Sequence, residues 1–211
     1  MRKFGNTGME IKRVGFGGIP IQRISQEDTN KVIDELEKCG VNFIDTARGY
    51  TISEEYLGNA LKGRREKFYI ATKSMSRDYE SMKKDIEISL KNLQTDYIDL
   101  YQMHNVKPAE YDTIFGEDRA YRALLEAKEA GKIKHIGITS HGLETVEKAV
   151  ESGKFETIQF PYNIVENQAD EVFKKAHEKG VGTIVMKPLA GGAIDDGTLA
   201  MKYLLSREYI D

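Results

Sequence analysis

The stretch Asn42-Phe43-Ile44-Asp45-Thr46-Ala47-Arg48-Gly49-Tyr50 decides the fold. Its apolar start, together with Val41, is typical of a short buried strand, and that strand ends at an acid. Five residues after Asp45, a tyrosine stands in a loop that contains a glycine. The pattern predicts a strand that brings Asp45 and Tyr50 to the same end of a sheet.

Two later apolar segments end in the same way. Residues 68–72 run into Lys73, and residues 98–103 run into His104. The carboxyl ends of neighbouring parallel strands meet at one edge of a sheet, and in a barrel they meet at one mouth. We therefore expect Asp45, Tyr50, Lys73 and His104 to lie together, and we call these four residues the candidate tetrad.

Strands alternate with amphipathic helices along the rest of the chain. A capping sequence at residues 25–28 opens the first predicted helix. The predicted helices cover 25–39, 53–63, 79–93, 120–130, 143–152, 169–179 and 198–206. The predicted strands cover 14–18, 41–44, 68–73, 98–104, 136–140, 157–161 and 183–186. Strict alternation of this kind predicts a parallel α/β sheet that helices cover.

Two folds satisfy this alternation, an open doubly wound sheet and a closed barrel. No phosphate-binding fingerprint follows the first strand, which favours the barrel, and a hairpin around residues 5–8 would plug its base. The chain stops at Ile210-Asp211, where an eighth strand would begin. The sequence thus predicts a single domain over residues 1–211, a (β/α)₈ TIM barrel with an N-terminal β-hairpin that lacks its eighth strand and helix. The first and seventh strands would then have open edges.

The composition narrows the functional classes. The chain has 211 residues and a net charge of −3. Binding to nucleic acid or to an anionic membrane usually requires excess positive charge, so neither is expected. Cys39 is the single cysteine, so neither an internal disulfide nor a zinc cluster is expected. The N-terminus lacks the apolar core of a signal peptide, and no apolar run approaches membrane length. We expect a cytoplasmic protein, and the oligomeric state is left open.

The candidate tetrad fits carbonyl reduction. A hydride that reaches a carbonyl carbon leaves negative charge on oxygen, which needs a proton donor and a fixed dipole. Tyrosine, with a pKa of about 10, is a weak acid, so Lys73 is expected to lower the pKa of Tyr50, with Asp45 holding the ammonium. His104 would orient the carbonyl by a hydrogen bond. Taken singly, each residue has a structural explanation, and it is their joint position that favours catalysis.

Several motifs closely resemble those of the aldo/keto reductase family over essentially the whole chain. They are Asp45-Thr46-Ala47-x-x-Tyr50, Lys73 after its strand, the run from Tyr97 to Gln102 followed by His104, and Gly131-Lys132-Ile133-Lys134-His135-Ile136-Gly137. The resemblance implies an NADP(H)-dependent oxidoreductase on a (β/α)₈ barrel that acts on small-molecule carbonyl substrates. It implies Tyr50 as general acid/base, with the rest of the candidate tetrad as its partners.

The resemblance also implies cofactor-binding residues. Thr139, Ser140 and Gln159 correspond to the nicotinamide carboxamide site, where the family usually has asparagine at the position of Ser140. Met186 stands where many members place an aromatic residue that stacks on the nicotinamide. The run Lys187-Pro188-Leu189-Ala190-Gly191-Gly192 resembles the loop on the pyrophosphate side. NAD(H) remains an alternative to NADP(H).

The chain looks like a C-terminally short member of the family. Its Met-Lys-Pro-Leu-Ala-Gly-Gly loop is similar to that of bacterial and archaeal members, some of which carry a C-terminal iron–sulfur extension. Nothing in these 211 residues could ligate such a cluster. The family's adenosine-binding residues follow strand eight and have no counterpart here.

Two other functions stay open. Lys73 in a barrel could form a Schiff base, as in a lyase or aldolase. Alternatively, the short barrel could be inactive or dependent on a partner, and act as a binding module through its open edge.

The substrate is not identified by the sequence. Arg48 could recognise an anionic substrate or simply pair with Glu54. His141 is similarly ambiguous, and Tyr111 and Phe115 could either line a substrate wall or pack their own loop.

Overall fold

A computed structural model describes all residues from 1 to 211. By its internal contacts the chain forms two compact units, each described by itself below. Unit 1 comprises Met1, Val14–His104 and Asp112–Ile136, and unit 2 comprises Arg2–Arg13, Asn105–Tyr111 and Gly137–Asp211. The expectation of a single domain stays a prediction.

Unit 1 is built on parallel strands in chain order. They are β3 (Phe16–Gly17), β4 (Phe43–Asp45), β5 (Tyr69–Ser74) and β6 (Ile98–Met103), and β7 (Ile133–Thr139) begins in this unit. Asp45 is in register with Ala71, and Lys73 with Gln102. Since alternate residues of a strand face the same side, Asp45, Lys73 and Gln102 share one face of the sheet.

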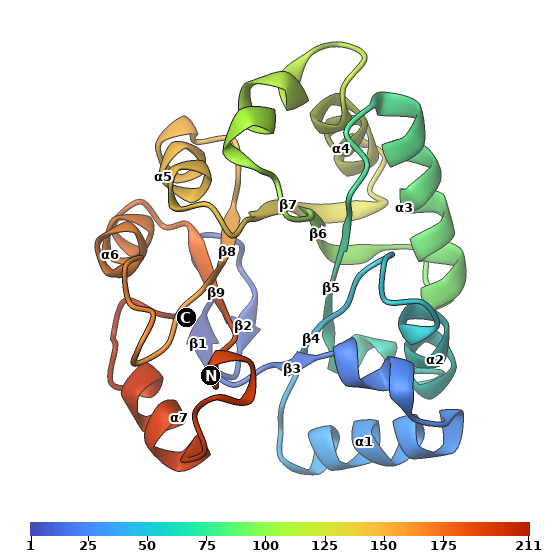
Figure 1. The fold of residues 1–211 in the computed structure, drawn as a ribbon. Coiled ribbons are helices and arrows are strands. Elements are labelled where there is room, and N and C mark those ends of the chain that lie inside the picture. The colour runs from blue at the N-terminus through green and yellow to red at the C-terminus, as the bar shows by residue number, and fades with distance from the viewer. The chain divides into compact units, whose positions relative to one another are not determined.

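Four helices belong to unit 1: α1 (Gln26–Lys38), α2 (Ser53–Ala60), α3 (Tyr79–Leu93) and α4 (Ala120–Glu129). In Figure 1, α2 and α3 run along one side of the strands of this unit. The Ser25 side chain accepts a hydrogen bond from the Asp28 backbone and so starts α1, as the capping sequence predicts. Met82 and Ile86, one turn apart on α3, are buried against the sheet side.

Unit 2 contains the end of β7 with β8 (Thr157–Pro161) and β9 (Gly182–Met186), again parallel and in chain order. Its helices are α5 (Leu143–Ser152), α6 (Asp170–Glu178) and α7 (Gly197–Leu205). The antiparallel hairpin of β1 (Arg2–Lys3) and β2 (Glu10–Ile11) also belongs to this unit.

The hairpin packs at the N-terminal end of β9 (Figure 1). The Asn6 backbone N–H donates to the Gly180 carbonyl at 2.7 Å. Phe4 is fully buried, and a Cβ on Gly182 would lie 2.7 Å from its ring, so only glycine allows this approach. Within unit 2 the hairpin therefore sits at the base of its strand, the end at which the sequence places it.

The last residues of the chain also lie at the start of β9. The Asp211 backbone N–H donates to Thr183 Oγ1, and the Thr183 N–H donates to Asp211 Oδ2, each at 3.1 Å. Arg13 donates to backbone carbonyls of this C-terminal segment, those of Leu205, Arg207 and Ile210. These bonds anchor the segment after α7 within unit 2.

The predicted fold class is confirmed. Seven parallel strands follow one another in chain order, and no eighth parallel strand is present. The order has no reversal, which excludes the doubly wound alternative. Helices α3 and α5 and strand β8 have the predicted bounds. The other elements differ from their predicted bounds by one to three residues at an end, and α2 ends at Ala60 rather than at residue 63. In addition, β7 begins at Ile133, whose side chain is buried, and the predicted loop after His104 contains a 3₁₀-helix, Pro108–Phe115.

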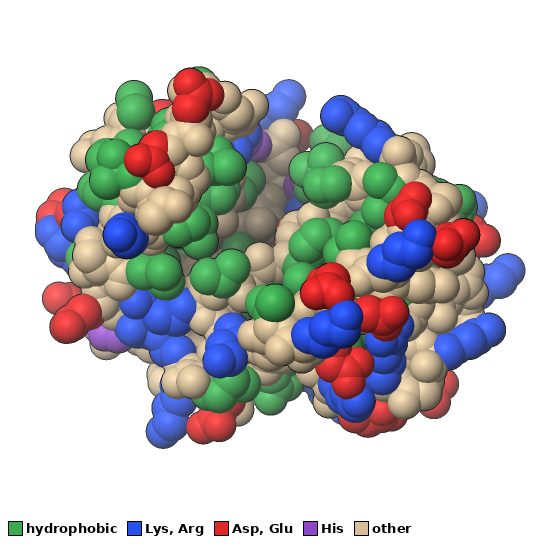
Figure 2. Space-filling model, turned by 90° about the horizontal axis from the view of Figure 1, so that it is seen from below, with side chains coloured by type: hydrophobic (Ala, Val, Ile, Leu, Met, Phe, Trp, Pro, Cys, Tyr) green, Lys and Arg blue, Asp and Glu red, His purple; other side chains and the backbone are tan.

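The surface carries charges of both signs. On the face shown in Figure 2, Lys and Arg side chains alternate with Asp and Glu side chains. Several are paired along one helix, such as Lys31 with Glu27 at 2.9 Å. None of the helices combines the length and apolar character that crossing a lipid bilayer requires.

Candidate active site

A buried ion pair joins the ends of β4 and β5. Lys73 Nζ donates to Asp45 Oδ2 at 2.6 Å and to the Thr46 carbonyl at 2.8 Å. The Lys73 side chain is 3% exposed and that of Asp45 is 13% exposed. An ion pair this far from water is held by its hydrogen bonds as much as by its charges.

Tyr50 and His104 lie beside this ion pair in unit 1. Lys73 Nζ is 5.0 Å from the centroid of the Tyr50 ring. The His104 ring meets the Tyr50 ring edge-on, with 6.0 Å between centroids. The structure thus brings the whole candidate tetrad together, as the strand pattern predicts.

The surroundings of Tyr50 shift the pKa of its phenol. Burial raises the pKa of the Tyr50 phenol above its ordinary value, and the charge of Asp45 raises it further. The net shift of the pKa is therefore upward, and the lowering by Lys73 that the sequence predicts stays a prediction. The Lys73 ammonium donates to Asp45 and to the Thr46 carbonyl, and it lies beside the face of the Tyr50 ring. The Tyr50 phenol is therefore protonated at neutral pH.

The backbone holds His104 in place just after β6. Its N–H donates to the Ser74 carbonyl at 2.8 Å, and its own carbonyl accepts from Arg77 at 2.8 Å. A residue that follows a strand can be positioned as firmly as one inside it when both backbone groups are bonded.

Gln102 is a site residue that the sequence interpretation missed. Its Nε2 donates to Asp45 Oδ1 at 3.1 Å, and its side chain is fully buried. It belongs to the strand motif quoted above, but no role was assigned to it. The available signal was its position, two residues before His104 on the strand that follows Lys73.

Arg48 is tied to the body of unit 1. Its Nη1 donates to Glu54 Oε2 at 2.6 Å, and its Nε lies 3.8 Å from Asp85 Oδ1. Glu54 is 1% exposed and also accepts hydrogen bonds from the hydroxyls of Thr72 and Ser89. Pairing with Glu54, one of the two alternatives for Arg48, is therefore what the structure shows.

Unit 2 contains the three residues expected at the carboxamide of the cofactor. Thr139 and Gln159 are register partners on β7 and β8, and the Ser140 N–H donates to the Gln159 carbonyl at 3.2 Å. The Ser140 hydroxyl donates to the Val106 carbonyl at 2.6 Å and accepts from the Gly142 N–H at 2.9 Å. Its single hydrogen is already used, so Thr139 and Gln159 are the better amide partners.

The loop after β9 offers an open backbone. Met186 ends β9 half-buried, and Lys187 has a φ of +57°. Gly191 and Gly192 also have positive φ, and a Cβ on either would meet no neighbouring atom. The Gly192 N–H already donates to the Leu189 carbonyl at 2.8 Å, so what the two glycines offer is a close approach to the backbone. Such a loop, with the amide partners Thr139 and Gln159, suits a nicotinamide dinucleotide.

A family model for aldo/keto reductases matches residues 13–208. The chain belongs to the aldo/keto reductase family. It is 31% identical over 216 residues to L-galactose dehydrogenase of Arabidopsis thaliana. That alignment covers 93% of this chain and 67% of the dehydrogenase. It is 30% identical over 214 residues to the aldo-keto reductase YhdN of Bacillus subtilis. Here the alignment covers 90% of this chain and 62% of YhdN.

Solved structures show the same likeness. A putative aldo-keto reductase of Pseudomonas aeruginosa matches with a TM-score of 0.88 at 25% identity, over 99% of this chain and 85% of that one. The holo form of the aldo-keto reductase AKR11C1 from Bacillus halodurans matches with a TM-score of 0.79 at 30% identity. The match covers 90% of this chain and 67% of that one. This aldo/keto reductase chain spans about two thirds of the length of the curated relatives named above.

The residues proposed for a substrate wall pack within their own units of this aldo/keto reductase chain. Tyr111 is buried against Phe155, with 6.5 Å between ring centroids, and Phe115 meets Tyr121 edge-on at 5.2 Å. His141 is exposed, and partial desolvation followed by the charge of Lys187 lowers its pKa. A role for His141 in the site stays a prediction.

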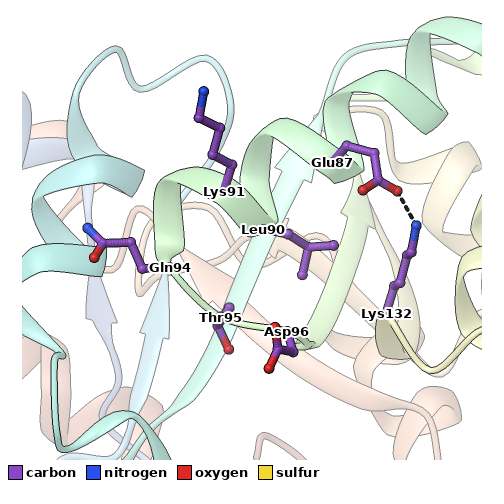
Figure 3. Close-up of a pocket in the computed structure, with 7 residues that line it drawn as sticks. All are labelled: Glu87, Leu90, Lys91, Gln94, Thr95, Asp96 and Lys132. Atoms are coloured by element: carbon purple, nitrogen blue, oxygen red, sulfur yellow. Dashed lines mark hydrogen bonds and ion pairs between the residues drawn. The ribbon is translucent and has the colours of Figure 1, made fainter.

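A hollow of about 480 Å³ lies at the other end of the strands of unit 1. Figure 3 shows that α3 and the residues before β6 and β7 line it, with an ion pair between Glu87 and Lys132. Asp96 and Lys132 precede the strands, whereas the candidate tetrad follows them. The hollow is therefore separate from the candidate active site of this aldo/keto reductase, at the end that serves stability in such folds.

Replacing Glu54 by Gln tests the anchor of the Tyr50 loop. The change leaves the Arg48 guanidinium with only the more distant Asp85, 3.8 Å from its Nε, as a charged partner. Because Arg48 is 23% exposed, we expect a moderate loss of about 2 kcal/mol in unfolding free energy. Urea unfolding followed by circular dichroism measures the loss. Glu55→Gln, at an exposed position on the same helix, is the matched control. Equal midpoints for the two variants would contradict the anchor.

Proposed function

We propose that the chain is an NADP(H)-dependent oxidoreductase that reduces aldehyde and ketone carbonyls to alcohols, or catalyses the reverse reaction. One observation carries the proposal: a protonated Tyr50 beside the Asp45–Lys73 ion pair and His104. A proton donor, a fixed cation and a second hydrogen-bond donor are what a carbonyl oxygen needs as it gains negative charge.

Reduced nicotinamide, when bound, supplies the hydride. Tyr50 gives its phenolic proton to the carbonyl oxygen, so Tyr50 itself carries the negative charge afterwards. The Lys73 ammonium, 5.0 Å from the ring centroid, stabilises that charge, and Asp45 keeps the ammonium where it is. His104, edge-on to Tyr50, orients the carbonyl by donating a hydrogen bond.

The cofactor would be held by residues of unit 2. In this proposal Thr139 and Gln159 bond the carboxamide, Ser140 adds to them only by giving up a backbone bond, and Met186 packs on the nicotinamide ring. Lys187, Pro188 and Leu189 follow on the pyrophosphate side. One relative, the NADH-specific methylglyoxal reductase of Escherichia coli, is 28% identical over 231 residues, so NADH is tested beside NADPH.

The test is a fluorescence titration of the 211-residue protein with NADPH and, in parallel, with NADH. Micromolar binding of NADPH followed by its oxidation in the presence of an aldehyde or ketone panel supports the proposal. Binding of neither nucleotide, or binding without turnover of any carbonyl, would overturn it for this chain and favour a binding module or a dependence on a longer chain.

The reaction should depend on pH in opposite ways in its two directions. Because the pKa of Tyr50 is raised, the phenol remains protonated, and the rate of reduction should stay level between about pH 6 and pH 9. Alcohol oxidation needs the deprotonated phenol and should become faster as the pH rises over the same interval. A reduction rate that falls steeply above neutral pH would show that the acid titrates lower than this.

The Schiff-base alternative is disfavoured by the state of Lys73. An amine must be deprotonated and accessible to attack a carbonyl. Lys73 Nζ instead donates to Asp45 and to the Thr46 carbonyl, and only 3% of its side chain is exposed. With these bonds and this burial, the amine is poorly placed to attack a carbonyl.

A further inference from the structure

We propose that Gln102 is a positioning residue, which orients the Asp45 carboxylate and thereby fixes Lys73 in front of Tyr50. The inference rests on the proposed function, because the position of Lys73 matters only if Tyr50 exchanges a proton. Neither the motif comparison nor the expected site residues assign a role to Gln102.

The register of the sheet places the three side chains on one face of neighbouring strands. Lys73 and Gln102 are direct partners on β5 and β6, and Asp45 lies one strand further, on the same face. Gln102 Nε2 donates to Asp45 Oδ1 at 3.1 Å, while Lys73 Nζ donates to Asp45 Oδ2 at 2.6 Å. Each carboxylate oxygen thus has its own donor from a different strand, so rotation of the carboxylate would break one bond or the other.

Burial makes this bond hard to replace. Gln102 is fully buried and Lys73 is 2% exposed, so water cannot readily take over as the second donor to Asp45. The amide must present its NH₂ group to Asp45, because its oxygen is an acceptor and cannot form a hydrogen bond with a carboxylate oxygen. The other end, Oε1, is buried and makes no hydrogen bond within the protein. Burying an amide oxygen without a hydrogen bond costs folding free energy that a leucine side chain would not cost. We infer that the amide is present for its N–H group, which bonds Asp45.

The consequence appears when Tyr50 has lost its proton. The charged and titratable groups around Gln102 are then Asp45 on β4, Lys73 on β5, Tyr50 on the loop after β4, and His104 after β6. If Asp45 turned, the ammonium would turn with it and leave the new phenolate less stabilised. A shift of about 1 Å in such a group can cost about 100-fold in rate.

Two substitutions test the proposal in the whole chain. We expect Gln102→Leu to lower kcat for carbonyl reduction about 100-fold with KM nearly unchanged, because substrate binding does not involve this amide. Gln102→Glu should lower kcat at neutral pH, where two carboxylates compete for Lys73, and should recover activity as the pH falls, since a protonated acid can again donate to Asp45. A merely structural role predicts no such recovery.

Thr157→Val is the matched control, since Thr157 is a fully buried strand residue whose hydroxyl makes no hydrogen bond within the protein. It should leave kcat and its pH profile unchanged. If the wild type turns over carbonyls and Gln102→Leu keeps kcat within about threefold, the positioning role is overturned and the proposed function stands.

A stability measurement tests the contact between Gln102 and Asp45 even if the chain proves to have no reductase activity. A double-mutant cycle of Gln102→Leu with Asp45→Asn, measured by urea unfolding, should give a coupling of about tenfold in the folding equilibrium constant. Such coupling supports the positioning contact even if the wild type shows no turnover. Additive effects would overturn it whether or not the chain is active.

Discussion

Replacing Tyr50 by phenylalanine should lower the rate of carbonyl reduction by about 10³-fold while leaving nicotinamide binding intact. The phenolic O–H is the proton donor, and the change removes only that group from a half-buried ring. The ring would keep its edge-on contact with His104 and its place beside Lys73. Single-turnover oxidation of NADPH with excess carbonyl measures the chemical step, and a fluorescence titration measures binding.

Tyr56→Phe is the matched control for this change. Tyr56 is a half-buried tyrosine of α2, a few residues along the chain from Tyr50, and it has no part in the candidate tetrad. It should keep the wild-type rate. Full activity of Tyr50→Phe would mean that another group supplies the proton, and the assignment of the general acid would then be wrong.

Replacing Lys73 by methionine should destabilise the protein by about 3 kcal/mol and abolish reduction. The Asp45 carboxylate, 13% exposed, would keep its bond from Gln102 but lose the charge that compensates it. Methionine fills nearly the same volume, so the loss measures charge and hydrogen bonding rather than a cavity. Urea unfolding at neutral pH gives the free energy of unfolding.

The double variant with Asp45→Asn separates this explanation from general damage. It should be more stable than Lys73→Met alone, because no unpaired buried charge is left. Lys31→Met is the surface control: Lys31 pairs with Glu27, but their side chains are 63% and 80% exposed, so its loss should cost little. A Lys73 variant as stable as this control would show that the ion pair does not support the fold.

These expectations follow from one feature of the site. The Tyr50 phenol is partly buried and lies near the Asp45 carboxylate, and both raise its pKa, so the tyrosine is protonated rather than a phenolate. In the proposed function, this protonated phenol is the group that gives its proton to the carbonyl oxygen. Removal of Lys73 therefore acts on the state after proton transfer and on the stability of Asp45, and less on the resting phenol.

Local sequence patterns determined the architecture. Apolar runs that alternate with amphipathic segments predict seven parallel strands with helices between them, and capping residues such as Ser25 set helix starts. The positions of Asp45, Lys73 and His104 at strand ends were predictable for the same reason. In a parallel sheet, position along a strand determines which end a side chain reaches.

Contacts between distant segments decided what each group does. The bond from Gln102 to Asp45 depends on the register of three strands, and the pairing of Arg48 with Glu54 depends on how α2 packs on β5. The direction of the Tyr50 pKa shift depends on burial and on the nearby charge of Asp45. Such quantities are sums over neighbours in space, which a linear pattern does not specify. The sequence therefore predicted which side chains meet at the strand ends, and only the tertiary structure decided their contacts.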